Sequence, residues 1–295
     1  MSTGWLIGSA VIAVIVAPLI GGLLRGIDRK LTAHMQGRIG PPIVQPFYDV
    51  IKLFGKKPMV AGGAQLAFAY AYLALIITAV VFFALRQDLL VVLFILFFGS
   101  LCLPIGALSV KSPYSQLGGH RELLQFLAYE PILLLAAIPI AMKAGDFPEG
   151  IKFRIADIFT HGQPLLPDLW ITFIALLIAL AIVMRKSPFD ISGSEHAHQE
   201  LVRGVVTEYS GPYLALIELG HWYEMVLLLS IMGLFWVTGS LWWLSIIIAL
   251  GSWFIMLVVD NINARLTWSW MLKFAWGAGL SLVALNILFI NLGWM

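Results

Sequence analysis

Cysteine and charged residues are scarce in this 295-residue chain. Its single cysteine, Cys102, lies within an apolar run, and charged residues account for 12% of the composition. One cysteine cannot form a disulfide within the chain, and an iron–sulfur cluster needs about four ligands. We therefore expect this chain to carry no redox cofactor of its own.

The sequence also lacks the short motifs of soluble enzymes, with no GxSxG, no P-loop and no GxGxxG that opens a helix. A net charge of +2, without a basic tail, gives no reason to expect a nucleic-acid partner. His196 and His198 invite a metal, but residues two apart diverge by about 200° around a helix, and neither HExxH nor cysteine accompanies them. We expect no catalytic residue and no metal site.

Hydrophobic residues make up 60% of the chain and gather in runs of membrane length. Backbone groups in lipid must be paired internally, so each run predicts a helix. The sequence thus predicts an all-α polytopic membrane protein with about eight transmembrane helices. Because no internal repeat is visible, we expect a single transmembrane domain over residues 1–295. The expected spans are residues 4–25, 66–86, 89–110, 121–143, 166–184, 212–237, 241–260 and 271–292.

The basic residues predict the orientation, because cytoplasmic loops carry an excess of Lys and Arg. With the N-terminus outside, 13 of the 18 fall on the inner side, and four fall on the outer side: Arg86, Lys143, Lys152 and Arg154. We therefore expect a multi-pass protein of the cell (cytoplasmic) membrane, with both termini outside and the large loops cytoplasmic. The inner set is Arg25, Arg29, Lys30, Arg38, Lys52, Lys56, Lys57, Lys111, Arg121, Arg185, Lys186, Arg203 and Arg265.

Two inner loops, residues 26–64 and 184–211, show the spacing of amphipathic helices. The first helix is expected either to lie at the lipid interface or to dock a partner protein, and the second is expected to meet a partner. Glu195, His196 and His198 would cap or line the start of the second helix and contact that partner. The apolar positions are Phe47, Val50, Ile51 and Phe54 in the first loop, and Leu201, Val202, Val205, Val206 and Tyr209 in the second.

Acidic residues occur inside the predicted spans, where an ionised Asp costs roughly 2.5–3.5 kcal/mol near a helix centre. Such groups usually face a bundle interior or a wet cavity. They either pass protons along a relay or only fasten helices together, and their number on two spans and one inner helix favours the relay. Glu218, His221 and Glu224 follow at three-residue steps, so they are expected to form a slanted polar stripe, and Asp260 is expected at the inner surface. The expected path is Glu122, Glu130, Glu200, Glu208, Glu218, His221, Glu224, Asp260 and Lys273, with Lys273 and Arg25 as cationic partners.

Five blocks of the sequence resemble the family that includes the H-type membrane subunit of bacterial complex I and its mitochondrial counterpart. They comprise IDRKLTAHMQGRIGPP with PFYDVIKLFGKK (27–57), RELLQFLAYEP (121–131), RKSPFDISGSEHAHQELVRGVVTEYSG (185–211), the region from Glu218 to Glu224, and DNINARLTWSWMLKF (260–274). The resemblance implies an eight-helix subunit that anchors a soluble redox arm.

The third block departs from the quinone-reducing branch, where a proline–glutamate–alanine run precedes ELV; here the segment reads ISGSEHAHQELV. This version resembles the membrane component of energy-converting nickel–iron hydrogenases, such as the B-type component of the Ech enzymes, and that of formate hydrogenlyase. The resemblance implies membrane acids at Glu130, Glu208, Glu218 and Glu224. Together with the loop patterns above, the resemblance predicts that the following residues dock a partner: Arg29, Arg38, Asp49, Arg185, Asp190, Glu195, His196, His198 and Arg203.

The expected function is that of membrane anchor and ion-translocation subunit of an energy-converting hydrogenase, which couples ferredoxin-linked proton reduction to proton or sodium movement. The expected partners are hydrogenase large and small subunits, an iron–sulfur subunit, an antiporter-like membrane subunit and lipid, with the nickel–iron and iron–sulfur centres in the partners. The alternatives are a quinone-binding subunit of a complex I-like NADH or ferredoxin oxidoreductase, a formate hydrogenlyase subunit, and a stand-alone transporter or purely structural anchor.

Overall fold

The computed structural model describes residues 3–59, 62–145, 147, 150–192, 203–237 and 241–294. Within these ranges, eight helices are long and apolar enough to cross a membrane, which confirms the predicted all-α polytopic fold. The spanning segments are α1 (Thr3–Met35), α3 (Gly63–Ala84), α4 (Leu89–Leu108), α5 (Pro113–Ala144), α7 (Leu166–Val183), α8 (Pro212–Gly233) with η2 (Leu234–Trp236), α9 (Trp243–Ile262), and the continuous run of α10 (Trp268–Phe274), η3 (Ala275–Leu280) and α11 (Ser281–Asn291).

Two of the spans begin or end well away from the bounds expected from hydropathy. The first helix continues past residue 25 to Met35, and α5 starts at Pro113 rather than at residue 121. Both extensions carry polar residues, which a hydropathy window excludes although the helical hydrogen bonding continues through them. The two long helices therefore bring charged residues to the end of the bundle from which the loop with α2 (Gln45–Phe54) extends.

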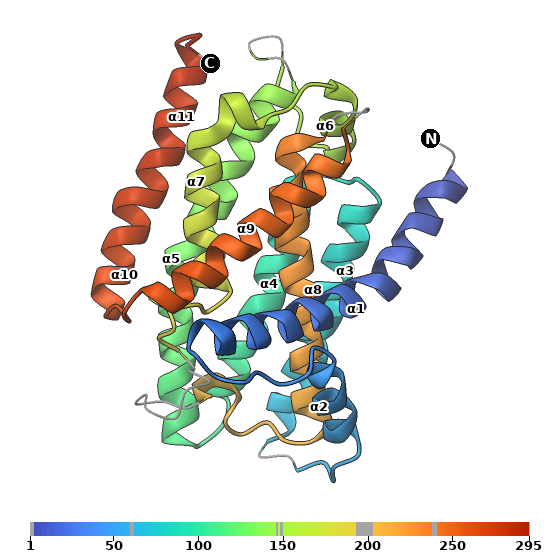
Figure 1. Cartoon of the computed structure of the whole chain (residues 1–295), viewed down its shortest axis with the longest axis vertical. Helices are drawn as coiled ribbons and strands as arrows, with labels where there is room; N and C mark the ends of the chain where they lie inside the picture. Colours follow the sequence, from blue (N-terminus) through green and yellow to red (C-terminus); the bar gives the residue numbers. More distant parts are fainter. Residues whose placement is uncertain are drawn as a thin grey trace.

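The central helices α3, α4, α5, α7 and α8 form an upright bundle, and α1 and α9 cross its front face obliquely (Figure 1). Both described chain ends lie at one end of this bundle, which we call the termini end, together with α6 (Ile155–His161). The opposite end carries α2, and we call it the α2 end. The α10–α11 segment packs along one edge against α5 and α7.

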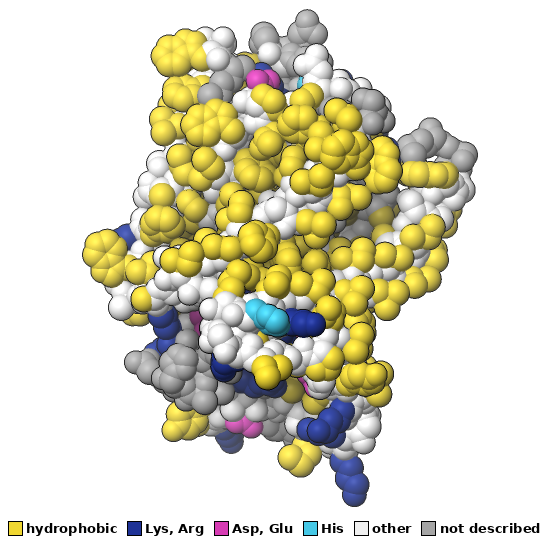
Figure 2. Space-filling view, in the orientation of Figure 1, with side chains coloured by type: hydrophobic (Ala, Val, Ile, Leu, Met, Phe, Trp, Pro, Cys, Tyr) yellow, Lys and Arg dark blue, Asp and Glu magenta, His cyan; other side chains and the backbone are white. Residues whose placement is uncertain are grey.

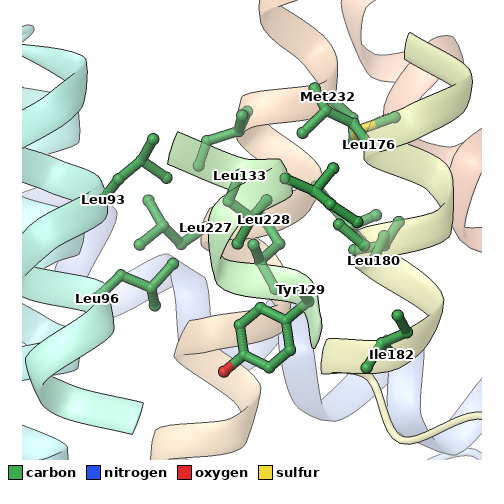
Figure 3. Close-up of a cluster of buried hydrophobic side chains, with 14 of the residues drawn as sticks. Leu93, Leu96, Tyr129, Leu133, Leu176, Leu180, Ile182, Leu227, Leu228 and Met232 are labelled. Atoms are coloured by element: carbon green, nitrogen blue, oxygen red, sulfur yellow. The ribbon is translucent and has the colours of Figure 1, made fainter. Parts of the chain in front are cut away.

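The core is built from aliphatic side chains of α4, α5, α7 and α8 (Figure 3). Small residues allow close helix packing in lipid, where no hydrophobic driving force pulls helices together. Ala136 and Ala137 of α5 and Ala175 and Ala179 of α7 are almost completely buried. The tight α5–α7 contact that results holds the central bundle together and leaves the polar residues of α5 at its α2 end.

The front face is strongly apolar on its surface as well. Figure 2 shows hydrophobic side chains over the α1 and α9 region of this face. The exposed residues of these two helices include Ile12, Ile15, Ile246 and Phe254. Lys and Arg on this face gather around the α2 end. An exposed apolar surface of this extent is the surface that a lipid bilayer covers.

The first predicted amphipathic helix is present as α2, but a different part of its surface is packed. Val50 forms a buried cluster with Ala215 and Trp222 of α8, and Phe47 and Leu53 pack against that cluster. Ile51 and Phe54 are exposed. The helix follows a two-residue turn and carries Pro46 in its first turn, as expected for a residue without a backbone N–H. The helix was thus predicted correctly, but the residues that face α8 differ from the expected apolar set.

The second predicted amphipathic helix is wrong for the described part of its range. Between Arg203 and Gly211 the structure has only the 3₁₀ turn η1 (Gly204–Val206). Arg203 has a φ of 58°, which ends any helix there, and Gly204 lies against Gly118 of α5. Val205 and Tyr209 are still buried, so their apolar spacing reflects a packed loop rather than a helix face.

We expect Gly204→Ala to lower the stability of the protein by about 1–3 kcal/mol, because it overpacks this contact. A Cβ at position 204 would lie 2.0 Å from the carbonyl oxygen of Ser192, and backbone atoms cannot move away cheaply. The measurement is the thermal midpoint of the purified protein in detergent. Gly251→Ala is the matched control, since no heavy atom lies within 4 Å of its added Cβ. Equal midpoints for the two variants would show that the contact does not constrain the loop.

Candidate functional site

A polar cavity of about 170 Å³ lies toward the α2 end, between α1, α8, α9 and the loop after α7. Both basic and acidic side chains line it, which is unusual at the depth of membrane-spanning helices. Charged or titratable residues at its wall are Arg25, Arg185, Lys186, Asp190, Arg203, Glu218, His221, Glu224 and Asp260. Three of them, Glu218, His221 and Glu224, form the polar stripe on α8 that their three-residue spacing predicted.

Arg185 links the polar residues of α5 and α8. Its guanidinium donates to the Oε1 atom of Glu122 from Nη2 at 2.7 Å and from Nε at 3.2 Å. A third nitrogen, Nη1, lies 3.1 Å from Nε2 of His221. Burial alone lowers the pKa of Arg185, but the charges of Glu122 and Glu224 outweigh it and the net shift is upward. Arg185 therefore stays a cation and fixes the position of both partners.

Glu224 is held in a buried site by two hydroxyl groups. Ser100 of α4 donates to its Oε1 at 2.7 Å, and Tyr72 of α3 donates to its Oε2 at 3.0 Å. Tyr72 reaches this position because Gly220 of α8 lies against its ring, where a Cβ would approach the ring to 2.2 Å. Ser100 and Tyr72 were not among the predicted site residues, and an isolated polar residue within an apolar run is the only sequence signal that points to them.

Glu130 is the deepest of the acids on α5. Its side chain is 5% exposed, and its Oε1 has no hydrogen-bond partner among the described residues. The second carboxylate oxygen of Glu122, Oε2, is in the same state. Buried polar atoms are normally satisfied, so each of these oxygens is suited to a water molecule or a bound proton. Tyr129, next to Glu130, turns its hydroxyl away from the leucine cluster in Figure 3.

Lys186 joins three segments that are distant in sequence. Its Nζ lies 2.7 Å from Oδ2 of Asp28 on α1 and 3.0 Å from Oδ2 of Asp260 on α9. The backbone N–H of Ser187 donates to the other oxygen of Asp260 at 2.8 Å, and Arg25 lies 3.7 Å from Asp28. We call Lys186, Asp28 and Asp260 the lysine triad. This pairing was not predicted, although the sequence placed Asp260 at the inner surface.

The loop that follows Arg185 is anchored by side chains of α5. Gln125 accepts from the N–H of Ser192 at 3.1 Å and donates to the carbonyl oxygen of Phe189. Arg265 adds a bond of 3.1 Å to the carbonyl oxygen of Ile191. Asp190 is buried and also lines the cavity. The described part of the predicted docking loop is therefore a fixed wall of the cavity.

The docking residues of the first loop lie farther out. Arg29 donates to Asp49 at 2.8 Å, which ties α1 to α2, and Gln45 donates to the same carboxylate at 3.0 Å. Burial by itself raises the pKa of Asp49, but these bonds and the charge of Arg29 outweigh it and the net shift is downward. Arg38 is exposed and bonded to Gln36. Arg203 is exposed at the rim of the cavity.

The remaining predicted site residues are not brought together. Glu208 is half-buried and does not line the cavity. Lys273 is exposed on α10, with its Nζ 5.4 Å from the centroid of the Trp270 ring, so it is not the cationic partner that was expected. Arg185 and Lys186 take that role instead, because their loop folds into the bundle. The predictions for Glu195, His196, His198 and Glu200 lie outside the described residues.

No group of three or more His, Cys, Asp or Glu side chains in the described part of the chain has an arrangement that would hold a metal ion. What the site offers chemically is a series of buried proton-binding groups. It begins at a charged cavity, passes the Arg185 contacts, and continues to Glu224 and Glu130 within the bundle. Such an arrangement can store and exchange protons or bind a cation, since carboxylates and histidine are the groups that do so.

Known proteins share both the sequence and this architecture. Over residues 7–291 the chain matches the family described as NADH dehydrogenase. It is 32% identical, over 315 aligned positions, to an H-type NADH-quinone oxidoreductase subunit of Cereibacter sphaeroides, with 93% of each chain covered. It is 30% identical to Hydrogenase-4 component C of Escherichia coli over 244 positions, which cover 77% of this chain and 74% of the relative.

A solved structure has the same fold. A chain of the membrane-bound sulfane sulfur reductase, an archaeal respiratory membrane complex, superposes with a TM-score of 0.84 and 26% identity, covering 95% of this chain and 98% of that one. Together with the eight spans, these relatives define the class: a membrane subunit of a complex I-like oxidoreductase. The chain belongs to the NADH dehydrogenase family, in which the H-type subunits and Hydrogenase-4 component C are its relatives.

Proposed function

We propose that this chain is the membrane anchor and ion-translocation subunit of an energy-converting nickel–iron hydrogenase. The similarity to Hydrogenase-4 component C supports this choice, as does the ISGSEHAHQELV segment that departs from the quinone-reducing branch. In this proposal, ferredoxin-linked proton reduction occurs in a soluble arm. The nickel–iron and iron–sulfur centres belong to the hydrogenase large and small subunits and the iron–sulfur subunit, and an antiporter-like subunit lies alongside in the membrane.

The single observation that carries the proposal is the continuity between cavity and bundle. Arg185 joins the cavity loop to Glu122 of α5 and His221 of α8, and Glu224 lies one helical turn beyond His221. A displacement of this loop by a docked partner would change the charge beside three proton-binding groups at once: the buried Glu122 and Glu224 and the partly buried His221. That change is the physical link between electron transfer in an attached arm and ion movement in the membrane.

The proposed orientation follows from the distribution of basic residues. On the face shown in Figure 2, Lys and Arg gather toward the α2 end, and cytoplasmic surfaces carry such an excess. We therefore place the α2 end on the cytoplasmic side of the cell membrane, with the soluble arm over the cavity and both termini outside. The exposed Arg38 and Arg203 are then available to that arm, and the Arg29–Asp49 pair holds α2 against α1 on the same side.

The test is to purify the complex through an affinity tag on this chain and to assay it with reduced ferredoxin. We expect hydrogen evolution without added quinone, co-purification of nickel-containing subunits, and acidification of the lumen of inside-out vesicles during turnover. The relatives that are NADH-quinone oxidoreductase subunits make quinone reduction the second candidate. Quinone-dependent electron transfer, without hydrogen and without nickel in the complex, would replace the hydrogenase proposal with that candidate.

A further inference from the structure

A second cavity, of about 390 Å³, lies on the front face and is almost entirely apolar. Its wall is formed by α1, α3, α6, α8 and α9, through residues that include Ile20, Phe83, Phe159, Leu229 and Ala249. Exposed side chains of α1 and α9 form its rim, so it opens toward the surface that the bilayer covers (Figure 2). We call it the front groove. It is distinct from the polar cavity near the α2 end.

The polar groups in the front groove are occupied by the protein itself. The hydroxyl of Ser230 donates to the carbonyl oxygen of Val226 at 2.7 Å, and that of Ser245 donates to the carbonyl oxygen of Gly233 at 2.7 Å. Apart from the indole of the exposed Trp242 at its rim, the groove thus offers van der Waals surface rather than hydrogen-bonding groups. An occupant of this part must be an apolar chain.

Arg86 lies at the end of the front groove nearest the termini. Its guanidinium carbon is 3.8 Å from the ring centroid of Phe159, which lines the groove, and 5.5 Å from that of Trp5 on α1. No carboxylate among the described residues pairs with it. Burial lowers the pKa of Arg86, yet an arginine remains charged in proteins, so within the described part of the chain it is a half-buried cation without a carboxylate partner.

The backbone at Arg86 is also unusual. Three non-glycine residues in the described ranges have a positive φ: Arg185, Arg203 and Arg86. A left-handed conformation costs such a residue roughly 1–3 kcal/mol and persists where the surroundings enforce it. Two of the three line the polar cavity, and the third directs its guanidinium to the aromatic rings at the groove.

We propose that the front groove and Arg86 form a binding site for one anionic phospholipid. An acyl chain fills the groove, and the phosphate of the headgroup pairs with the guanidinium of Arg86. The two features fit one molecule, because the cation lies at the termini end, at the level where the helices leave the membrane. Trp5 beside it is typical of the headgroup level, where tryptophan side chains anchor helices. The proposal concerns a lipid and does not depend on the hydrogenase assignment.

The test titrates the delipidated, full-length protein complex with dioleoyl phosphatidylglycerol or dioleoyl phosphatidylcholine and counts retained lipids by native mass spectrometry. We expect saturable binding of phosphatidylglycerol and weaker binding of phosphatidylcholine. Arg86→Gln should weaken phosphatidylglycerol binding about tenfold, the worth of a typical charge-assisted hydrogen bond. Arg154→Gln is the matched control, because it removes the same charge from an exposed position at the same end.

A second pair of variants tests the acyl chain. Ala249→Phe fills the groove and leaves Arg86 unchanged, so it should abolish retention even if Arg86→Gln fails to fold. Gly251→Phe adds the same bulk to α9, at a position where no heavy atom lies within 4 Å of a built Cβ, and should bind as the wild type does. Equal retention of the two lipids, or equal effects of Arg86→Gln and Arg154→Gln, would overturn the proposal. So would unchanged binding by Ala249→Phe.

Discussion

Under the proposed function, replacing Glu130 with glutamine should reduce proton translocation by the intact complex about 100-fold, the usual contribution of a positioned proton-transfer group to a rate. Glu130 is almost fully buried, and its Oε1 has no hydrogen-bond partner among the described residues. Glutamine keeps the size and a hydrogen-bonding oxygen but cannot carry a proton. Assembly and electron transfer should therefore survive. The measurement is lumenal acidification in sealed vesicles, divided by the rate of hydrogen evolution in the same vesicles.

Two further variants make the Glu130 result specific. Glu130→Asp keeps the carboxyl group and should restore part of the translocation. Asp157→Asn removes a carboxylate from α6, away from the polar cavity, and should pump as the wild type does. If Glu130→Gln pumped at the wild-type ratio, the buried acids would serve only to fasten helices. Simultaneous loss of Glu218 and Glu224 should uncouple the complex in the same way.

Lys186→Met should destabilise the protein by about 3–5 kcal/mol, the typical cost of removing one partner from a buried ion pair. The lysine side chain is 10% exposed and that of Asp28 is 6% exposed, so the two carboxylates of the lysine triad would lose the cation between them, and Asp28 would keep its longer, 3.7 Å contact with Arg25. The thermal midpoint in detergent should fall by roughly 10 °C. Lys143→Met is the control: its partner Asp168 is 47% exposed, and such pairs contribute about 1 kcal/mol or less.

Removing an acid together with the lysine should reverse part of this effect. The double variant Lys186→Met, Asp28→Asn leaves one carboxylate, that of Asp260, which still accepts the N–H of Ser187. We expect it to recover about half of the lost midpoint, since the like-charge contact is gone. If the single variant matched Lys143→Met, the triad would contribute no more than a surface pair. Another interaction would then have to hold α1, α9 and the cavity loop together.

The sequence predicted the spans well because lipid imposes one solution on every long apolar run, namely a helix with its backbone bonded internally. It also placed Glu218, His221 and Glu224 on one polar stripe, since the helical period fixes their relative directions. All three line the cavity. The helical period does not say which neighbouring helix packs against a given face. The contacts of Tyr72 and Ser100 with Glu224 depend on that packing and were missed.

The loops show the second limit of sequence patterns. Apolar spacing predicted a helix through Val205 and Tyr209. Both side chains are buried, but they belong to a largely irregular segment that packs against Gly118. In α2 the expected face included Ile51 and Phe54, which are exposed, because apolar residues in a membrane protein face lipid as readily as protein. The cation expected at Lys273 was likewise supplied by a loop, through Arg185 and Lys186.

The length of α1 has a consequence for the lipid around the protein. Its 33 residues extend about 50 Å, well beyond the roughly 30 Å of a hydrocarbon core, and the helix crosses the front of the upright bundle at a slant (Figure 1). A slanted helix shelters a wedge of bilayer between itself and the upright bundle. Molecules in that wedge are bounded by protein on two sides and should exchange with the surrounding membrane more slowly than an ordinary boundary layer does.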